Sequence, residues 1–228
     1  MIRYYDKQYC LIWTNREEFI DMAMSETAGK IIEKLWNGEE VSEEEIRKTP
    51  LSETDLIEIL SSMDEELERN PVPGAKSVYL ANGWFTPSQV SLLFKQYRAL
   101  LLNETIGHIH VPLLHQYQGA PYIADEGTDM GYEWATMTYK ADVLAIHNSD
   151  LVVAAFPAGD EDSGTAVETG IAIGSHTPVV TYYEGDIDKY PINLMIAFGA
   201  DSYVRSEEEL TTFDFLDIAP KKYEGKII

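Results

Sequence analysis

Apolar residues recur at helical spacing in two segments near the N-terminus, which predicts two helices there. These residues are Ala28, Ile31, Ile32 and Leu35 in the first segment and Leu56, Ile59, Leu60 and Met63 in the second. Ser52, with Asp55 three residues later, predicts a capped start for the second helix. Residues 4–13 are typical of a short strand element, and a turn-forming segment ends at Gly74. We therefore expect residues 1–74 to form a small, mainly helical domain.

From residue 77 onward the pattern changes to apolar strands that alternate with helices. The predicted strands cover residues 78–81, 108–111, 151–156 and 178–183. One predicted helix begins at Pro87, and three others cover residues 132–148, 165–175 and 191–198. Apolar strands separated by helices are typical of a parallel sheet covered on both faces. Residues 75–228 are thus expected to form an α/β domain with a doubly wound, five-stranded parallel sheet of the flavodoxin or Rossmann type.

The charge of the chain limits the ligands that it can bind. It has 17 Lys and Arg against 39 Asp and Glu, a formal net charge of −22 at pH 7. Residues 1–74 contain 18 of the acids and 8 of the bases, so the shorter part is the more densely charged. Such a chain repels phosphate backbones and anionic lipid surfaces, which argues against a nucleic-acid polymer or a membrane as a partner.

Hydrophobic residues make up 45% of the chain, which is enough for a packed core. Cys10 is the single cysteine, so no disulfide can form within the chain. No apolar run approaches the roughly 18–20 residues of a membrane-spanning helix, and the first residues lack the apolar stretch of a signal peptide. These features lead us to expect a cytoplasmic protein.

Ligands of open parallel sheets bind at the carboxyl ends of the strands, which selects the loops at residues 81–85, 112–119 and 157–164. The third loop leads into a helix of small residues. Glu168 is expected in the first turn of that helix, where the dipole favours an ionised carboxylate, and Asp162 lies just before it. By itself the segment also fits a capping aspartate and a solvated helix charge. It lacks the residues of a phosphate-binding loop and the glycine spacing of a dinucleotide site.

Six segments between residues 77 and 228 resemble the nucleoside 2-deoxyribosyltransferase family, in the same order and at similar spacing. They are residues 79–85 (YLANGWF), 116–119 (QYQG), 134–142 (WATMTYKAD), 162–170 (DSGTAVETG), 191–195 (PINLM) and 223–225 (YEG). Each segment is weak evidence alone, whereas the ordered set is specific. The chains of this family usually begin near the Tyr79 strand, so residues 1–74 are additional here.

The resemblance implies three catalytic residues: Glu168 as the nucleophile at C1′ of 2-deoxyribose, Tyr79 as the residue that positions this carboxylate, and Asp142 as the acid that exchanges a proton with the base. It also implies a set of substrate-binding residues, some of them in the site of a neighbouring subunit of a homo-oligomer. This set is Asp162 at the sugar; Gln116, Gly83, Trp84 and Phe85 on the base side; and Asn193, Met195 and the Ile228 carboxylate from the neighbour.

Other interpretations of these residues follow from their types alone. Without the resemblance, Tyr79, Trp84 and Phe85 fit core aromatics, Asp142 fits a solvated helix charge and Asn193 fits a helix cap. Ile228 stands where well-known members of the family have an aromatic residue, so the resemblance extends to its carboxylate and not to its side chain.

The residue types suit cleavage of an N-glycosidic bond, which develops positive charge on the sugar and negative charge on the departing base. One carboxylate can trap the sugar covalently, and a carboxyl group of raised pKa can protonate the base. Two carboxyl groups divide the work in the same way in glycoside hydrolysis. We expect deoxynucleosides and free purine or pyrimidine bases as ligands. This chemistry needs no metal or organic cofactor, and none is expected. The histidines also show no metal-ligand spacing beyond His108 and His110.

Transfer of 2-deoxyribose between bases is the first of three hypotheses. Water could resolve the same intermediate, which would make the protein a deoxynucleoside or deoxynucleotide hydrolase. The nucleotide version is disfavoured by the scarcity of cations near the loops, where Lys140 is the nearest in sequence. A hypothesis of another class is a non-catalytic sensor of nucleotide derivatives, with residues 1–74 as its partner-binding module.

Overall fold

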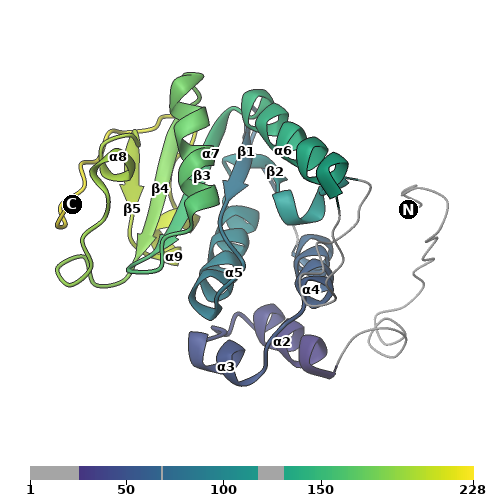
Figure 1. The fold of residues 1–228 in the computed structure, drawn as a ribbon. Helices are drawn as coiled ribbons and strands as arrows, with labels where there is room; N and C mark the ends of the chain where they lie inside the picture. The colour runs from purple at the N-terminus through teal and green to yellow at the C-terminus, as the bar shows by residue number, and fades with distance from the viewer. Residues whose placement is uncertain (1–25, 68, 118–130) are drawn as a thin grey trace.

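The computed structural model describes residues 26–228 except residue 68 and residues 118–130. The strand element expected at residues 4–13 lies outside the described residues. Five parallel strands form one sheet in the order β2-β1-β3-β4-β5 (Figure 1). The strands are β1 (Lys76–Ala81), β2 (Ile106–His110), β3 (Leu151–Pro157), β4 (Val179–Glu184) and β5 (Ser202–Val204). The predicted five-stranded parallel sheet is confirmed, and its strand order reverses between β1 and β3.

Helices cover both faces of the sheet, as the doubly wound pattern predicts. One face carries α5 (Pro87–Leu102) and α9 (Glu207–Thr211), and the other carries α6 (Gly131–Asn148), α7 (Ser163–Gly174) and α8 (Leu194–Ala197). Every residue of β3 is buried, and successive side chains join opposite cores: Val153 packs on the α5 side and Val152 on the α7 side. Among the described residues, no helix is both long and apolar enough to cross a membrane.

Three N-terminal helices lie on the α5 side of the sheet (Figure 1). They are α2 (Glu26–Trp36), α3 (Glu43–Lys48) and α4 (Glu53–Glu66). Helices α3 and α4 pack against α5, and α2 packs against α4. Their buried apolar residues join the core that α5 shares with the sheet, so α5 is enclosed by neighbours and buries residues around most of its circumference. The capping box predicted at Ser52 and Asp55 is present. A second capping box, Ser42 with Glu45, begins α3, whose first turn contains three glutamates, and is not among the features predicted above.

The segment at residues 191–198 differs from the prediction, because its helix does not begin at Pro191. Ile192 instead pairs with Ile227 in a parallel bridge. The Asn193 side chain then accepts the backbone N–H of Met195 at 2.9 Å and caps α8. The alternative interpretation of Asn193 as a helix cap is therefore correct in this chain. The sequence pattern does not reveal the position of strand β5, because three residues are too few to show a periodicity.

A buried polar network ties α5 to the sheet behind the first loop of the carboxyl edge. Asn82 Nδ2 donates to Gln96 Oε1 at 3.0 Å, and Gln96 Nε2 donates to the carbonyl oxygen of Val153 at 2.8 Å. Both side chains are buried. An amide buried without such partners would be costly, so these bonds hold β1, α5 and β3 in one arrangement.

Candidate active site

Two loops meet at the carboxyl end of the sheet where the strand order reverses. The carboxylate of Asp160, after β3, accepts hydrogen bonds from the hydroxyl groups of Thr86 and Ser88, which follow β1. The loops also touch at Gly83, where an added Cβ would lie 2.9 Å from the Cβ of Asp162. A glycine is therefore required for this close approach. In open α/β sheets, ligands bind in the crevice at this reversal.

Tyr79 and Glu168 meet beside this crevice. Tyr79 Oη donates a hydrogen bond of 2.6 Å to Glu168 Oε1, across 89 residues of sequence. Tyr79 is fully buried on β1, and Glu168 is partly exposed on α7, the helix that follows β3. Burial and the nearby carboxylates raise the pKa of Tyr79, so its hydroxyl stays protonated and acts as a donor. The structure thus brings together two of the three residues predicted as catalytic.

The expected place of Glu168 in the first turn of its helix is wrong. Asp162 is the N-cap and Ser163 the first helical residue, so Glu168 lies in the second turn. The dipole contributes little beyond the first turn. Burial raises the pKa of Glu168 to about 8, and repulsion from Asp142 and Asp162 adds to the shift. The hydrogen bond from Tyr79 opposes it and is the local contact that favours the ionised carboxylate.

Asp142 reaches the same place from α6. Its charge acts on both Glu168 and Tyr79. Burial raises the pKa of Asp142 to about 6. Its Oδ1 atom is buried and makes no hydrogen bond in the described part of the chain. A buried carboxyl oxygen is costly without a partner, which suits a group that hydrogen-bonds to a bound ligand.

A stack of rings supports Tyr79 on the β2 side. The rings of Tyr79 and His110 stack with centroids 5.4 Å apart, and those of His110 and His115 lie 4.3 Å apart. Burial lowers the pKa of His110 to about 4, and the neighbouring histidines add to the shift, so its ring is neutral at pH 7. The sequence pattern does not predict this contact. Tyr79 and His110 are partners in the register of β1 and β2, which neither strand's own pattern reveals.

Asp162 caps a helix and also lies near Glu168. Its Oδ2 atom accepts the backbone N–H of Thr165 at 2.6 Å and the Thr165 hydroxyl at 3.0 Å, as expected of a capping aspartate. Its charge also raises the pKa of Glu168, which places it near the candidate nucleophile. The cap therefore holds one oxygen of Asp162 at the start of α7 while the residue remains beside the crevice.

The residues predicted on the base side have different surroundings. Gln116 is buried, and its Oε1 atom makes no hydrogen bond within the described residues. The Trp84 indole packs toward the N-terminal helices, where Nε1 donates to Glu53 Oε1 at 3.0 Å. Phe85 is 67% exposed, with its ring against that of Trp84. Of these two rings, Phe85 is thus the exposed one, and Trp84 is packed against the core.

Asn193, Met195 and Ile228 lie together near the chain terminus. The Ile228 N–H donates to the carbonyl oxygen of Ile192 at 3.0 Å, which holds the terminus beside the start of α8. Met195 is 73% exposed and Ile228 69% exposed. Within the described chain, no hydrogen bond joins any of the three to Tyr79, Glu168 or Asp142.

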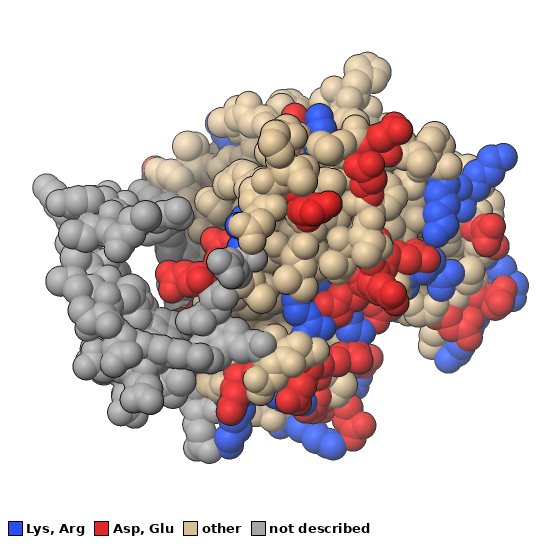
Figure 2. Space-filling view, turned by 180° about the vertical axis from the view of Figure 1, so that it is seen from behind, with Lys and Arg blue, Asp and Glu red and all other residues tan. Residues whose placement is uncertain are grey.

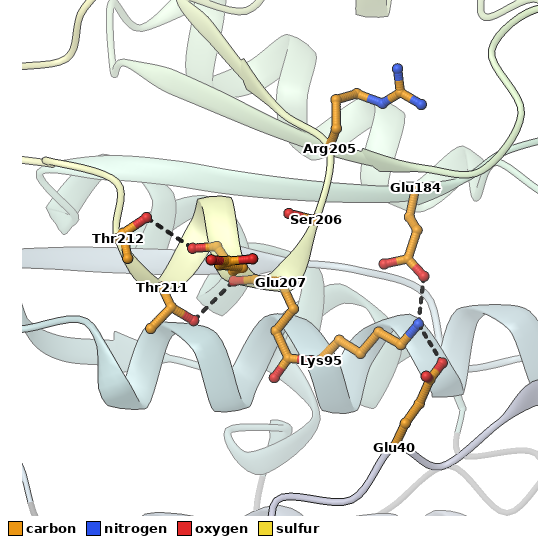
Figure 3. Close-up of a pocket in the computed structure, with 9 residues that line it drawn as sticks. Glu40, Lys95, Glu184, Arg205, Ser206, Glu207, Thr211 and Thr212 are labelled. Carbon is orange, nitrogen blue, oxygen red and sulfur yellow. Dashed lines mark hydrogen bonds and ion pairs between the residues drawn. The ribbon is translucent and has the colours of Figure 1, made fainter.

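A cavity of about 600 Å³ lies away from this crevice, between the N-terminal segment, α5, the end of β4 and α9 (Figure 3). Its lining is charged or hydroxylated: Glu40, Lys95, Glu184, Arg205, Ser206, Glu207, Glu208, Thr211 and Thr212. Lys95 pairs there with Glu40 at 2.8 Å and with Glu184 at 2.5 Å. None of the predicted site residues lines it. In the part of the chain that the structure describes, no three His, Cys, Asp or Glu side chains gather as metal ligands.

Residues 78–195 match the model of the nucleoside 2-deoxyribosyltransferase family, a range that contains every predicted site residue except Ile228. The chain is 30% identical over 149 residues to the nucleoside deoxyribosyltransferase of Limosilactobacillus fermentum, which covers 64% of this chain and 88% of the relative. It is 31% identical over 156 residues to that of Lactobacillus leichmannii, with 67% and 98% covered. The solved 2-deoxyribosyltransferase from Bacillus psychrosaccharolyticus is similar with a TM-score of 0.54 and 25% identity, over 65% of this chain and 99% of that one.

We expect the raised pKa of Glu168 to make the folded protein less stable as pH rises from about 4.5 to about 8. Over this range the folded state retains a proton that the unfolded state releases, so rising pH favours unfolding. Glu168→Gln removes the titration and keeps an acceptor for Tyr79. Its free energy of unfolding should equal that of the wild type near pH 4.5 and exceed it at pH 8 by on the order of 4 kcal/mol.

Urea unfolding at both pH values, with Glu65→Gln as the control at an exposed glutamate, measures this difference. A pH dependence that is the same in the wild type and in Glu168→Gln would contradict the raised pKa.

Proposed function

The chain belongs to the nucleoside 2-deoxyribosyltransferase family, and we propose on this premise that it transfers 2-deoxyribose from one nucleobase to another. The observation that carries the proposal is the 2.6 Å hydrogen bond between Tyr79 and Glu168 at the reversal of the strand order, with the Asp142 carboxyl group beside it. The three residues supply a nucleophile, a donor that orients it and an acid, which are the groups that the reaction needs.

In the first step, the Glu168 carboxylate attacks C1′ of the bound deoxynucleoside. The bond between C1′ and the base nitrogen breaks, and its electron pair stays on the base. The Asp142 carboxyl group gives its proton to the base, and a covalent deoxyribosyl ester of Glu168 remains. Because the Tyr79 hydroxyl holds Oε1, the other oxygen of Glu168 is the one that bonds to the sugar.

In the second step, a nitrogen of the incoming base attacks C1′ and displaces the Glu168 carboxylate. The Asp142 carboxylate takes a proton from that base, which restores the starting protonation of the site. Each step inverts C1′, so the product has the same anomeric configuration as the substrate. Atoms and protons balance between the two bases, and water takes no part.

The protonation of the two carboxyl groups sets a cost on the first step. With pKa values of about 8 for Glu168 and about 6 for Asp142, the pair carries one proton at pH 7, and in the free site this proton is on Glu168. The first step needs the proton on Asp142 and an ionised Glu168. The difference of about two pK units corresponds to roughly 3 kcal/mol. A base that accepts a hydrogen bond from Asp142 favours the reactive arrangement and offsets part of this cost.

The charge distribution favours an uncharged ligand. On the face shown in Figure 2, Lys and Arg lie interspersed with Asp and Glu. The cations that the structure places near α5 are already paired, Lys95 with Glu40 and Glu184, and Arg98 with Glu207 at 2.5 Å. A nucleoside needs no cation for binding, whereas a nucleotide phosphate does. We therefore propose deoxynucleosides and free bases as the substrates.

Incubation of the protein with 2′-deoxyinosine and excess adenine or cytosine, followed chromatographically, tests the proposal. We expect a new deoxynucleoside, and we expect Glu168→Ala to abolish its formation while the protein stays folded, because the covalent intermediate has no other acceptor. Glu65→Gln is the control. Free base with deoxyribose would instead indicate hydrolysis, and binding without turnover would indicate a sensor. Substantial transfer by Glu168→Ala would exclude Glu168 as the nucleophile.

Asp142→Asn tests the second carboxyl group through the pH dependence of kcat/KM. The wild type should give a bell-shaped profile with limbs near pH 6 and pH 8, because only the singly protonated pair is reactive. Asp142→Asn cannot donate a proton to the base, so activity should fall by about 10²–10³-fold. The alkaline limb should vanish, and the remaining acid limb should report the ionisation of Glu168 and lie above pH 6, because burial still raises the pKa of that carboxyl group. A variant profile that keeps both limbs would show that another group is the acid.

We propose in addition that a second copy of the chain covers helices α6, α7 and α8. Ile146 is the one residue of α6 that is fully buried among those described. Large apolar side chains are exposed on this side of the molecule: Tyr132, Met137, Tyr139, Leu144, Val167, Ile173, Leu194, Met195 and Phe198. Monomeric proteins seldom expose so many apolar residues on one side. A second copy would bury them and would bring Asn193, Met195 and Ile228 to a neighbouring crevice.

Leu144→Asp, at a residue 60% exposed on α6, should dissociate the assembly, because a carboxylate in an apolar interface loses its hydration. Light scattering coupled to size-exclusion chromatography measures the mass. Leu102→Asp, at a residue 50% exposed on the α5 side of the sheet, is the matched control and should keep the wild-type mass. A wild type that is a monomer at assay concentration would exclude a site to which two copies of the chain contribute residues.

A further inference from the structure

The N-terminal helices lie outside the range matched by the family model. The segment between α2 and α3 nevertheless makes hydrogen bonds to α5, the helix that follows the loop at residues 81–85. Ser91 Oγ of α5 donates to the carbonyl oxygen of Val41 at 2.8 Å. Arg98 Nη1 donates to the carbonyl oxygen of Glu39 at 3.0 Å. Lys95 reaches Glu40, as Figure 3 shows. Three residues of one helix are thus fixed to the segment between α2 and α3.

A fourth contact reaches the loop itself. Trp84 Nε1 donates a hydrogen bond of 3.0 Å to Glu53 Oε1. Glu53 is the first residue of α4, and the capping box of Ser52 and Asp55 fixes where that helix begins. The indole also packs against the core that contains the N-terminal helices. A hydrogen bond to a charged acceptor is among the stronger ones in proteins, so α4 determines the orientation of Trp84.

Trp84 in turn supports Phe85. Their ring centroids lie 5.2 Å apart with an interplanar angle of 33°. The Phe85 N–H donates to Gln89 Oε1 at 3.1 Å, which fixes its backbone, and its ring is 67% exposed. An exposed aromatic ring that packs against an indole beside the candidate site offers a flat apolar surface to a planar heteroaromatic base. The indole N–H of Trp84 is already used by Glu53, so Trp84 acts on that surface from behind.

We propose that Glu53 is a positioning residue for the base. Through Trp84 it fixes the ring of Phe85, so that the N-terminal helices form part of the site's recognition of planar bases. This inference rests on the proposed function and adds to it a residue outside the family's domain. Glu53 acts on base binding and not on Glu168, so its loss should raise KM and leave kcat nearly unchanged.

Glu53→Ala and Glu53→Gln test the inference with Glu43→Ala as a matched control. Glu43 is likewise the first residue of a helix that a serine capping box begins, and it is paired with Arg47. We expect Glu53→Ala to raise KM for the acceptor base and its Kd by calorimetry about tenfold, the loss of one charge-assisted hydrogen bond. Glu53→Gln keeps an acceptor oxygen and should stay within about threefold of the wild type.

Trp84→Phe removes the donor and keeps an aromatic ring, so it completes a double-mutant cycle with Glu53→Ala. If the two residues act as one unit, the Kd of the double variant for the base should be no higher than that of the single variant with the higher Kd. Fully additive effects, or a KM for Glu53→Ala equal to that of Glu43→Ala, would overturn the inference. A fall in kcat of Glu53→Ala with an unchanged Kd would overturn it as well.

The calorimetric Kd separates this inference from the proposed function. If the wild type binds bases without transfer, the proposed function fails and the effect of Glu53 on Kd still decides the inference. If the wild type transfers deoxyribose and Glu53→Ala binds bases normally, only the inference fails. A wild type that binds no base at all would overturn both.

Discussion

The hydrogen bond from Tyr79 to Glu168 depends on the topology of the sheet. Tyr79 is on β1, and Glu168 is on the helix after β3, so the bond requires these two strands to be neighbours. It also requires Gly83, because a side chain there would meet Asp162 and push the two loops apart. The ring of His110 supports Tyr79 from β2. The position of the Glu168 carboxylate therefore depends on three adjacent strands as well as on its own helix.

Burial gives the site its acid–base properties. Glu168 and Asp142 both have raised pKa values because they are withdrawn from water, and for Glu168 the nearby carboxylates add to the shift. The Tyr79 hydroxyl favours the ionised form of one member of the pair only. Two carboxyl groups with different surroundings can take different parts in one reaction. The molecule as a whole carries a charge of −22, but the few acids at the crevice have properties that follow from local burial and not from that net charge.

The N-terminal helices extend this arrangement beyond the family's domain. They enclose α5, whose first turn follows the loop that carries Trp84 and Phe85. Through Glu53 they also contact that loop directly. A helix packed on both sides has little freedom to shift, so the loop at its start is held more firmly than by the sheet alone. The additional residues thus lie where they can influence the shape of the base side.

Features that depend on neighbouring residues can be predicted from the sequence. The alternation of strands and helices predicted the parallel sheet, the pair Ser52 and Asp55 predicted the start of α4, and the ordered motifs singled out Tyr79, Asp142 and Glu168. Three other features are visible only in the folded chain: the stacking of His110 on Tyr79, the turn of α7 in which Glu168 lies and the bond between Glu53 and Trp84. Periodicity and capping act over a few residues, whereas strand register and helix packing join segments far apart in the chain, and no local pattern encodes their relative position.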